Sequence, residues 1–96
     1  MTFVTLEYTL KFRNITNKDA EKVTLENKAT IEQLLKYLKD KYGEEFEKEF
    51  TNPSGDKVSG TPLILLNGRA LNFSGDLNIY IKNGDTITFT YAIVGG

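Results

Sequence analysis

The last eleven residues of the chain, 86–96, have the sequence TITFTYAIVGG. Isoleucine, phenylalanine and tyrosine alternate there with threonine, which is the period-two pattern of a half-buried β-strand. We therefore predict a strand over residues 86–94, which runs directly into Gly95 and Gly96. Because glycine has no Cβ, it adopts backbone angles closed to other residues and leaves the terminal carboxylate unshielded. The stretch thus predicts a core strand followed by a carboxylate that another enzyme can reach.

Residues 3–12, FVTLEYTLKF, have the same alternation at the other end of the chain. One side of this predicted strand is apolar and is made up of Val4, Leu6, Tyr8, Leu10 and Phe12. The asparagines in residues 14–19 favour a turn, since asparagine tolerates left-handed backbone angles. Residues 22–26 then predict a second strand that pairs back on the first as a hairpin.

A helix is predicted after this hairpin. Thr30 and Gln33 have the spacing of a capping box, in which each side chain bonds the backbone of the other at the first turn. Apolar residues follow at helical intervals and form one stripe, made up of Ile31, Leu34, Leu35, Leu38 and Tyr42. Gly43 is placed to end the helix. Residues 44–50 predict a further helical turn or two, and residues 51–62 predict an irregular surface loop.

The remaining predicted strands are short. Residues 63–66 are four consecutive apolar residues, Asn67-Gly68 is a turn signal, and residues 70–73 predict a short returning strand. A second tight turn is predicted at residues 83–85. This order predicts an α+β fold, with a mixed four- or five-stranded sheet and one main helix on one face. The first and last strands have the cleanest alternation, so we place both near the sheet centre, where they can run parallel.

The apolar run Leu63, Ile64, Leu65 and Leu66 is an exception to the alternation. In a strand, either the first and third of these side chains or the second and fourth must point away from the helix. The outward pair leaves apolar surface on the open face of the sheet, and such surface often marks a docking site for a partner. Alternatively, this strand is covered on both faces or lies under the long loop. The sequence leaves both interpretations open.

Composition limits the possible functions. The chain has 96 residues, of which 40% are hydrophobic and 26% charged, so we predict a single soluble domain over residues 1–96. The net charge of −1 argues against direct nucleic-acid binding, which normally uses a basic face. There is no signal-peptide pattern and no apolar run approaching the ~20 residues of a membrane span. We therefore expect a cytoplasmic protein that has no membrane partner.

The chain contains no cysteine and no histidine. Disulfides, thiolate nucleophiles and cysteine metal sites are therefore excluded, and the commonest general base and metal ligand is missing. Acidic residues cluster after the main helix at Glu44, Glu45, Glu47 and Glu49. This cluster is better explained as a solvated helix face than as a metal site, and Asp85 as a turn residue than as a catalytic acid. No glycine-rich phosphate-binding motif is present. We expect no catalysis, no metal and no cofactor bound by the domain itself.

The ordered set of these features resembles the ubiquitin-like β-grasp family of sulfur carriers and protein modifiers. The resemblance is carried by the strand FVTLEYTLKF, the helix after it, LLNG at residues 65–68, NGDTITF at residues 83–89 and the terminal VGG. The chain is similar to the ubiquitin-related modifier, the small subunit of molybdopterin synthase and the thiamine sulfur carrier. The ubiquitin-related modifier is the most similar, because its threonine-rich last strand also runs straight into the diglycine. The molybdopterin synthase subunit typically has a Pro-Pro pair where this chain has Tyr91-Ala92.

The resemblance implies that the protein is a substrate of other enzymes. A ubiquitin-activating-type enzyme would use ATP and magnesium to adenylate the carboxylate of Gly96, next to Gly95. The stem that this partner grips would be Ala92, Ile93 and Val94, within a flexible tail of residues 92–96. Sulfur from a partner persulfide protein would then give a thiocarboxylate, for sulfur transfer to an accepting enzyme, such as tRNA thiolation. Alternatively, a lysine of a target protein would form an isopeptide bond.

Two other functions stay open at this point. One is the small sulfur-carrier subunit of molybdopterin synthase, which acts in molybdenum cofactor biosynthesis and inserts its tail into a larger catalytic subunit. The other is a non-covalent β-grasp interaction module that binds a partner through the open face of the sheet. Sulfur donation and conjugation start from the same adenylate, so the sequence does not separate them.

Overall fold

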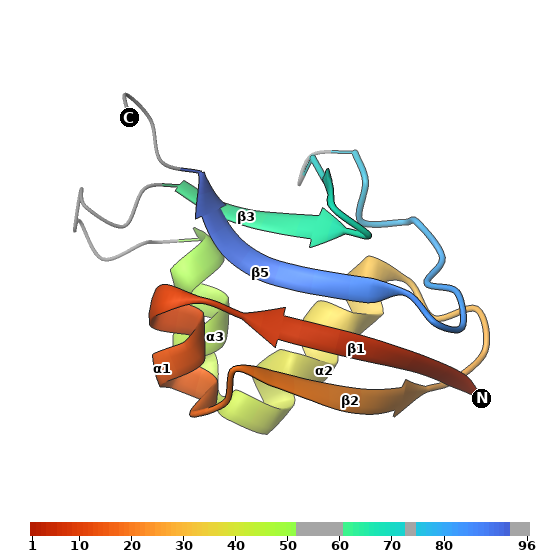
Figure 1. Ribbon diagram of the computed structural model, residues 1–96, viewed down its shortest axis with the longest axis horizontal. Helices are drawn as coiled ribbons and strands as arrows, with labels where there is room; N and C mark the ends of the chain where they lie inside the picture. Colours follow the sequence, from red (N-terminus) through yellow and green to blue (C-terminus); the bar gives the residue numbers. More distant parts are fainter. Residues whose placement is uncertain (52–60, 73–74, 93–96) are drawn as a thin grey trace.

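The computed structural model describes residues 1–51, 61–72 and 75–92. Its elements are β1 (Thr2–Tyr8), α1 (Leu10–Thr16), β2 (Ala20–Leu25), α2 (Ile31–Tyr42), α3 (Glu44–Thr51), β3 (Thr61–Leu66), β4 (Arg69–Ala70) and β5 (Thr86–Ala92). In these ranges the five strands form one mixed sheet, with α2 and α3 against one face and α1 at one end of the same layer (Figure 1). The predicted α+β fold, a mixed sheet with a main helix on one face, is confirmed.

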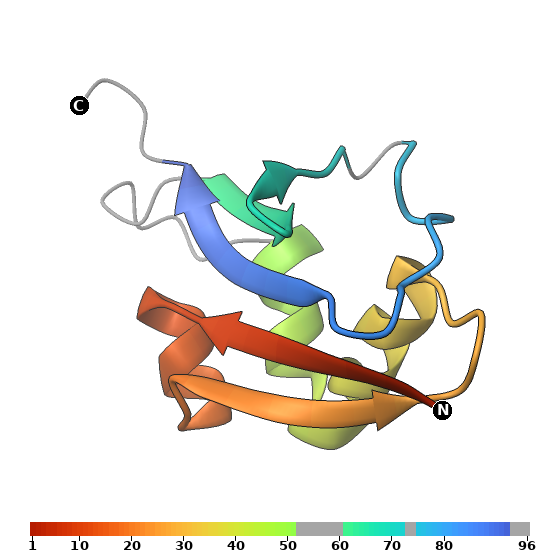
Figure 2. The ribbon, with the colours of Figure 1, turned by 45° about the vertical axis from the view of Figure 1, so that its right-hand side comes forward.

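The strand order in the sheet is β2-β1-β5-β3-β4. β1 and β5 are parallel neighbours in the middle, as predicted, and their register pairs Leu6 with Ile87 and Tyr8 with Phe89. β2 is antiparallel to β1, and β3 is antiparallel to β5. Because β1 and β5 are parallel, both end on the same side of the molecule, and α1 lies next to that end (Figure 2).

The first predicted strand is wrong in its second half. β1 ends at Tyr8, and the short helix α1 begins at Leu10. Between them, the Thr9 N–H donates to the Phe89 carbonyl (3.1 Å), and the Thr9 hydroxyl donates to the Thr90 hydroxyl (2.9 Å). These bonds hold Thr9 on the sheet. Leu10 then takes a φ of 50°, which turns the chain away from the sheet.

The alternation also predicts the wrong surroundings for Leu10. Phe12 is buried as expected, but it enters the core from α1 rather than from a strand. Leu10, which the alternation places on the core side, is 45% exposed. A left-handed backbone costs a leucine roughly 1 kcal/mol. The bonds between Thr9 and β5 and the burial of Phe12 outweigh this local cost.

The predicted turn at residues 14–19 is partly helical. α1 extends to Thr16, and Asn17 then takes the left-handed conformation that asparagine tolerates, with a φ of 61°. Its N–H donates to the Arg13 carbonyl (2.7 Å) and so ends the helix. β2 follows and is antiparallel to β1, as predicted. The predicted hairpin is therefore two paired strands that are joined by a helix.

The prediction of the main helix is confirmed in detail. The Thr30 hydroxyl accepts a hydrogen bond from the Gln33 N–H (3.2 Å), and the Gln33 side chain accepts one from the Thr30 N–H (2.9 Å). This is the predicted capping box. Gly43 follows the helix with a φ of 88°, and its N–H donates to the Lys39 carbonyl (2.7 Å). The further helical turns predicted after Gly43 form α3.

The core lies between the helices and the sheet. The predicted stripe of α2 faces it, since Ile31, Leu34 and Leu38 are buried and Leu35 and Tyr42 pack against them. Aromatic rings from β1, α1, α2, α3 and β5 meet at the end of the core near α1. This aromatic cluster consists of Tyr8, Phe12, Tyr42, Phe46, Phe89 and Tyr91. It anchors both central strands close to their C-terminal ends.

The other half of the sheet differs from the prediction in its boundaries. β3 begins at Thr61, inside the predicted loop, of which residues 52–60 lie outside the described residues. The predicted turn joins β3 to β4 with Asn67 and Gly68 at φ values of 52° and 86°. β4 has only two residues, and Phe73 at the end of the predicted returning strand lies outside the described residues. In the ranges that the structure covers, no helix is long and apolar enough to span a membrane.

Candidate functional site

The predicted reactive terminus follows β5. Four of the predicted site residues lie outside the described residues: Ile93, Val94, Gly95 and Gly96. Ala92, the first residue of the predicted tail, is instead the last residue of β5, and its register partner is Thr61 of β3. β5 pairs with β1 on one side and with β3 on the other. Residue 93 therefore directly follows a strand that lies in the middle of the sheet.

The structure shows which residues of β3 face outward. Ile64 is 1% exposed and Leu66 packs against the core, so both point toward the helices. Leu63 and Leu65 are half-buried and point to the opposite face, against which no described helix packs. This open face is therefore the place where the apolar run exposes side chains.

Threonines of β5 lie beside these two leucines. The register pairs Leu63 with Thr90 and Leu65 with Thr88, and we call these four residues the leucine–threonine patch. The Thr88 hydroxyl donates to the Glu7 carboxylate (2.9 Å), so part of the polar surface of the patch is satisfied within the sheet. The patch offers leucine side chains and threonine methyl groups, which suit a largely apolar partner surface.

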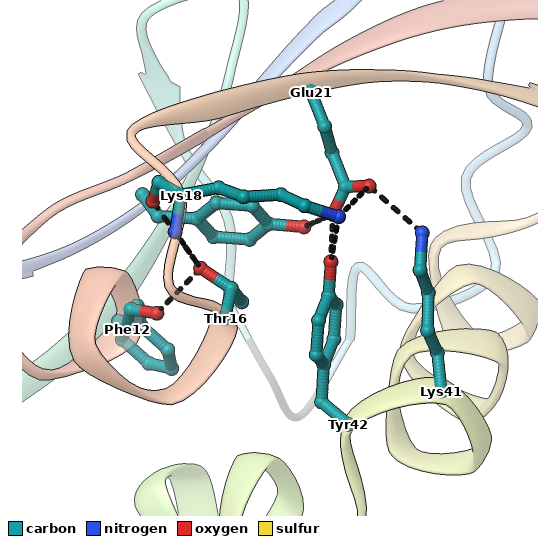
Figure 3. Close-up of polar contacts among 7 residues, drawn as sticks. Phe12, Thr16, Lys18, Glu21, Lys41 and Tyr42 are labelled. Atoms are coloured by element: carbon teal, nitrogen blue, oxygen red, sulfur yellow. Dashed lines mark hydrogen bonds and ion pairs between the residues drawn. The ribbon is translucent and has the colours of Figure 1, made fainter.

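A polar cluster lies on the helix side of the sheet, near β2 (Figure 3). At its centre, the Glu21 carboxylate accepts hydrogen bonds from the hydroxyls of Tyr8 (2.7 Å) and Tyr42. It also accepts from the ammonium groups of Lys41 (2.8 Å) and Lys18 (3.4 Å). The sequence prediction missed this cluster, because its residues are far apart along the chain.

The cluster links elements of the fold. Partial burial opposes ionisation of Glu21, but hydrogen bonds from Lys41, Tyr42 and Tyr8 outweigh it and lower the pKa of Glu21 to about 2. Burial and the neighbouring Glu21 carboxylate raise the pKa of the Tyr8 hydroxyl. Near neutral pH, Glu21 is therefore ionised and Tyr8 protonated. We therefore interpret these hydrogen bonds as structural contacts that hold β1, β2 and α2 together, rather than as a catalytic acid–base pair.

We predict that Glu21→Gln lowers the free energy of unfolding by about 1–2 kcal/mol at pH 7, because a carboxylate with several donors is replaced by a neutral amide. The folded-state pKa of Glu21 lies below its ordinary value of 4.5, so its contribution is present above pH 4.5 and is lost as the pH falls toward 2. Urea unfolding from pH 7 to pH 2 should show the two proteins converging. The exposed Glu26, changed to Gln, is the control, and a constant difference at all pH values would contradict the interpretation.

The prediction that the acidic residues of α3 form a solvated face is only partly correct. Glu44 and Glu45 are exposed, and Glu47 pairs with Lys39 (3.1 Å). Glu49, however, is buried, and it lies beside Tyr91 of β5. Burial and the Glu49 carboxylate raise the pKa of the Tyr91 hydroxyl. Among the described residues, no group of three or more acidic side chains is arranged to hold a metal ion.

Asp85 is a turn residue, as predicted, and its side chain makes hydrogen bonds within and between two turns. Its carboxylate accepts hydrogen bonds from the Lys82 N–H (2.7 Å) and from the Asn67 side-chain amide (2.9 Å). The Thr86 N–H donates in turn to the Asn67 side-chain oxygen (2.8 Å). Asp85 therefore fixes the turn before β5 against the turn after β3.

Solved structures with the same fold cover nearly the whole chain. Small archaeal modifier protein 1 from Methanosarcina acetivorans has a TM-score of 0.71 at 21% identity, over 100% of this chain and 98% of its own. CysO from Mycobacterium tuberculosis has a TM-score of 0.67 at 23% identity, over 94% and 99%. A Pyrococcus furiosus protein that carries the name of molybdopterin converting factor subunit 1 has a TM-score of 0.73 at 22% identity, over 96% and 100%. This likeness establishes the ubiquitin-like β-grasp fold.

A family model gives the second comparison. The model of Urm1, the ubiquitin related modifier, matches residues 4–96. The match begins within β1, includes every later element up to β5 and continues to Gly96. Curated protein sequences give no match.

Proposed function

The chain belongs to the ubiquitin related modifier family, and we propose that it acts through adenylation of its Gly96 carboxylate by a partner enzyme. Members of this group are ubiquitin-like sulfur carriers and modifiers rather than catalysts. The observation that carries the proposal is the family match, which extends through the diglycine. After activation, the protein donates sulfur, becomes attached to lysines of target proteins, or does both.

The chemistry explains why a partner is needed. A carboxylate is a poor electrophile, so neither sulfur nor an amine attacks it directly. A carboxylate oxygen of Gly96 attacks the α-phosphorus of ATP, with magnesium on the phosphates, and pyrophosphate leaves. The outer sulfur of a persulfide protein, or a lysine amine, then attacks the acyl carbon, and AMP leaves. In the first route the product is an acyl disulfide, and a second thiol of the persulfide protein cleaves its S–S bond. This releases a thiocarboxylate for sulfur transfer, such as tRNA thiolation, and leaves a disulfide on the donor protein. The second route gives an isopeptide bond.

The position of β5 limits how the partner approaches. Four residues, 93–96, connect Ala92 to the Gly96 carboxylate, and four residues span at most about 14 Å when fully extended. An enzyme that holds the Gly96 carboxylate must therefore come within this distance of the end of β5. Leu63 is in register with Thr90, two residues before Ala92, so the leucine–threonine patch lies on this approach. We propose that the partner contacts the patch while it grips residues 92–94.

We predict that Leu65→Asp raises the KM for the protein in its adenylation by about tenfold or more, with kcat unchanged. The reason is that burying one leucine side chain in an interface contributes roughly 1.5–3 kcal/mol, and 1.4 kcal/mol is a tenfold effect. ATP–pyrophosphate exchange measures both constants. Phe3→Asp is a matched control, because Phe3 is 59% exposed and lies on the same open face. It is near the start of β1, whereas the patch is level with the end of β1. Equal KM values for the two variants would argue against docking at the patch.

The proposed function is tested by the intact mass of the protein purified from its own cells, under conditions that protect thiols. A mass increase equal to the replacement of one oxygen by sulfur, localised to Gly96, would establish a sulfur carrier. Larger species joined by a Gly96–lysine isopeptide bond would establish a modifier. A stable complex with a larger subunit that makes molybdopterin would favour the molybdopterin synthase role. An unmodified terminus, in the presence of ATP and an adenylating enzyme, would favour the non-covalent interaction module.

A further inference from the structure

β2 is the outer strand at one end of the described sheet, and no described residue pairs with its outer edge. The Tyr8 N–H donates to the Asp19 carbonyl (2.9 Å), which fixes the hydrogen-bonding register of β1 and β2. Bonded pairs alternate along an antiparallel ladder, so the next positions of β2 that bond to β1 are Glu21, Val23 and Leu25. The alternate residues direct their N–H and C=O groups outward: Ala20, Lys22 and Thr24. All three are exposed.

A hollow of about 300 Å³ lies between the end of β2 and α2. Leu25, Ala29 and Tyr37 contribute apolar surface to it, and Gln33, Asn27 and Lys28 contribute polar groups. Tyr37 is 39% exposed, so part of its ring is accessible to a partner. The Lys41 ammonium lies 5.8 Å from the centre of its ring. A chain laid along β2 could place one apolar side chain in this hollow, against Tyr37.

The charge near this edge is positive, although the whole chain has a net charge of −1. Two of the nearby lysines, Lys18 and Lys41, share the one carboxylate of Glu21, and Arg13 is ion-paired with Asp19 (3.4 Å). Lys22 on β2 and Lys28 at the hollow add two further positive charges. Glu26 remains as a carboxylate at the hollow. A partner of negative charge is therefore favoured here.

We propose that the outer edge of β2 binds an extended acidic segment of a partner protein, which adds a strand to the sheet and places an apolar side chain in the hollow beside Tyr37. Main-chain hydrogen bonds from Ala20, Lys22 and Thr24 give affinity, and the hollow and the lysines give specificity. A second copy of this chain fits the edge poorly, because antiparallel pairing around Lys22 would bring like charges together. β1 separates this edge from the leucine–threonine patch on β5 and β3, and the proposal does not depend on the activation of Gly96.

The probe for this test is a short synthetic peptide of alternating valine and glutamate, titrated into the isotope-labelled protein and followed by NMR. We expect the largest shift changes at the amides of Ala20, Lys22 and Thr24 and in the ring of Tyr37. A peptide of alternating valine and lysine should bind at least about tenfold more weakly, since it meets like charges. Shift changes centred on Leu63 and Leu65, equal binding of the two peptides, or no binding would each overturn the proposal.

Two variants at one position separate backbone pairing from charge. Lys22→Pro removes an N–H that points outward and leaves the bonds between β1 and β2 in place, as proline is tolerated on an outer edge. It should weaken binding of the acidic peptide about tenfold, and Lys22→Gln, which keeps the N–H, should weaken it less. If Lys22→Pro fails to fold, the same peptide N-methylated at alternate residues removes the partner's donors instead, and undiminished binding of that peptide would overturn the proposal. If the β2 amide shifts change with protein concentration when no peptide is present, the edge binds a second copy of the chain. That result would also overturn the proposal.

Discussion

Removal of Gly95 and Gly96 is expected to abolish adenylation of the protein, and to change its free energy of unfolding by less than about 0.5 kcal/mol. The truncated chain still ends in a carboxylate, but that carboxylate belongs to Val94. It is nearer to β5 and carries a branched side chain next to the acyl carbon. The shortened stem spans roughly 7 Å less, so the carboxylate no longer reaches an active site that accepts the full terminus.

ATP–pyrophosphate exchange with the adenylating enzyme measures the first effect, and urea unfolding measures the second. Removal of Met1 is the matched control, because Met1 is 71% exposed and is also a terminal residue. It should leave exchange and stability unchanged. Full exchange with the truncated chain would show that the diglycine is dispensable, and the interaction-module alternative would then be preferred.

Local pattern was sufficient where one element is specified by its own residues. The capping box of Thr30 and Gln33 and the glycine at 43 predicted the bounds of α2, because capping bonds form between neighbours in sequence. The alternation after residue 86 predicted β5 in the same way. These elements needed no information about the rest of the chain.

The same pattern failed at α1, where distant residues determine the conformation. Leu10 and Phe12 continue the period-two alternation of β1, so nothing in the local sequence ends the strand at Tyr8. The chain turns because Thr9 bonds to β5 and Phe12 packs between Phe46 and Phe89. The contacts of Thr9 and Phe12 with β5 join residues about eighty positions apart, and the local sequence carries no signal of them.

The site shows the same division between local and distant information. The sequence indicated that β3 would expose two apolar side chains, but the choice between Leu63 and Ile64 depends on the register with β5. A shift of one residue exchanges the two faces of a strand. The burial of Glu49 and the contacts of Glu21 were also missed, since their partners come from other elements. In each case the residue type was visible, but its surroundings were not.

The largest stability effect is expected for Phe46→Ala. Phe46 is 1% exposed, and its ring lies 5.3 Å from that of Phe89 and 5.4 Å from that of Phe12, measured between ring centres. The ring of Tyr8 lies 6.3 Å away. Replacing a buried phenylalanine by alanine costs about 3–5 kcal/mol, because transfer energy is lost and a cavity remains. A domain of this size has roughly 5–14 kcal/mol of stability, so a large part is lost.

Thermal unfolding should show a melting temperature lowered by roughly 15–30 °C, as each kcal/mol shifts a domain of this size by several degrees. Phe3→Ala is the control, because Phe3 is 59% exposed and its removal leaves no cavity. Phe46→Leu should recover part of the loss, since leucine refills part of the space. Phe46 joins α3 to both central strands, so the folded fraction of Phe46→Ala, not its KM, should limit adenylation. Exchange activity that falls at temperatures where the variant is fully folded would instead give Phe46 a role in placing the end of β5.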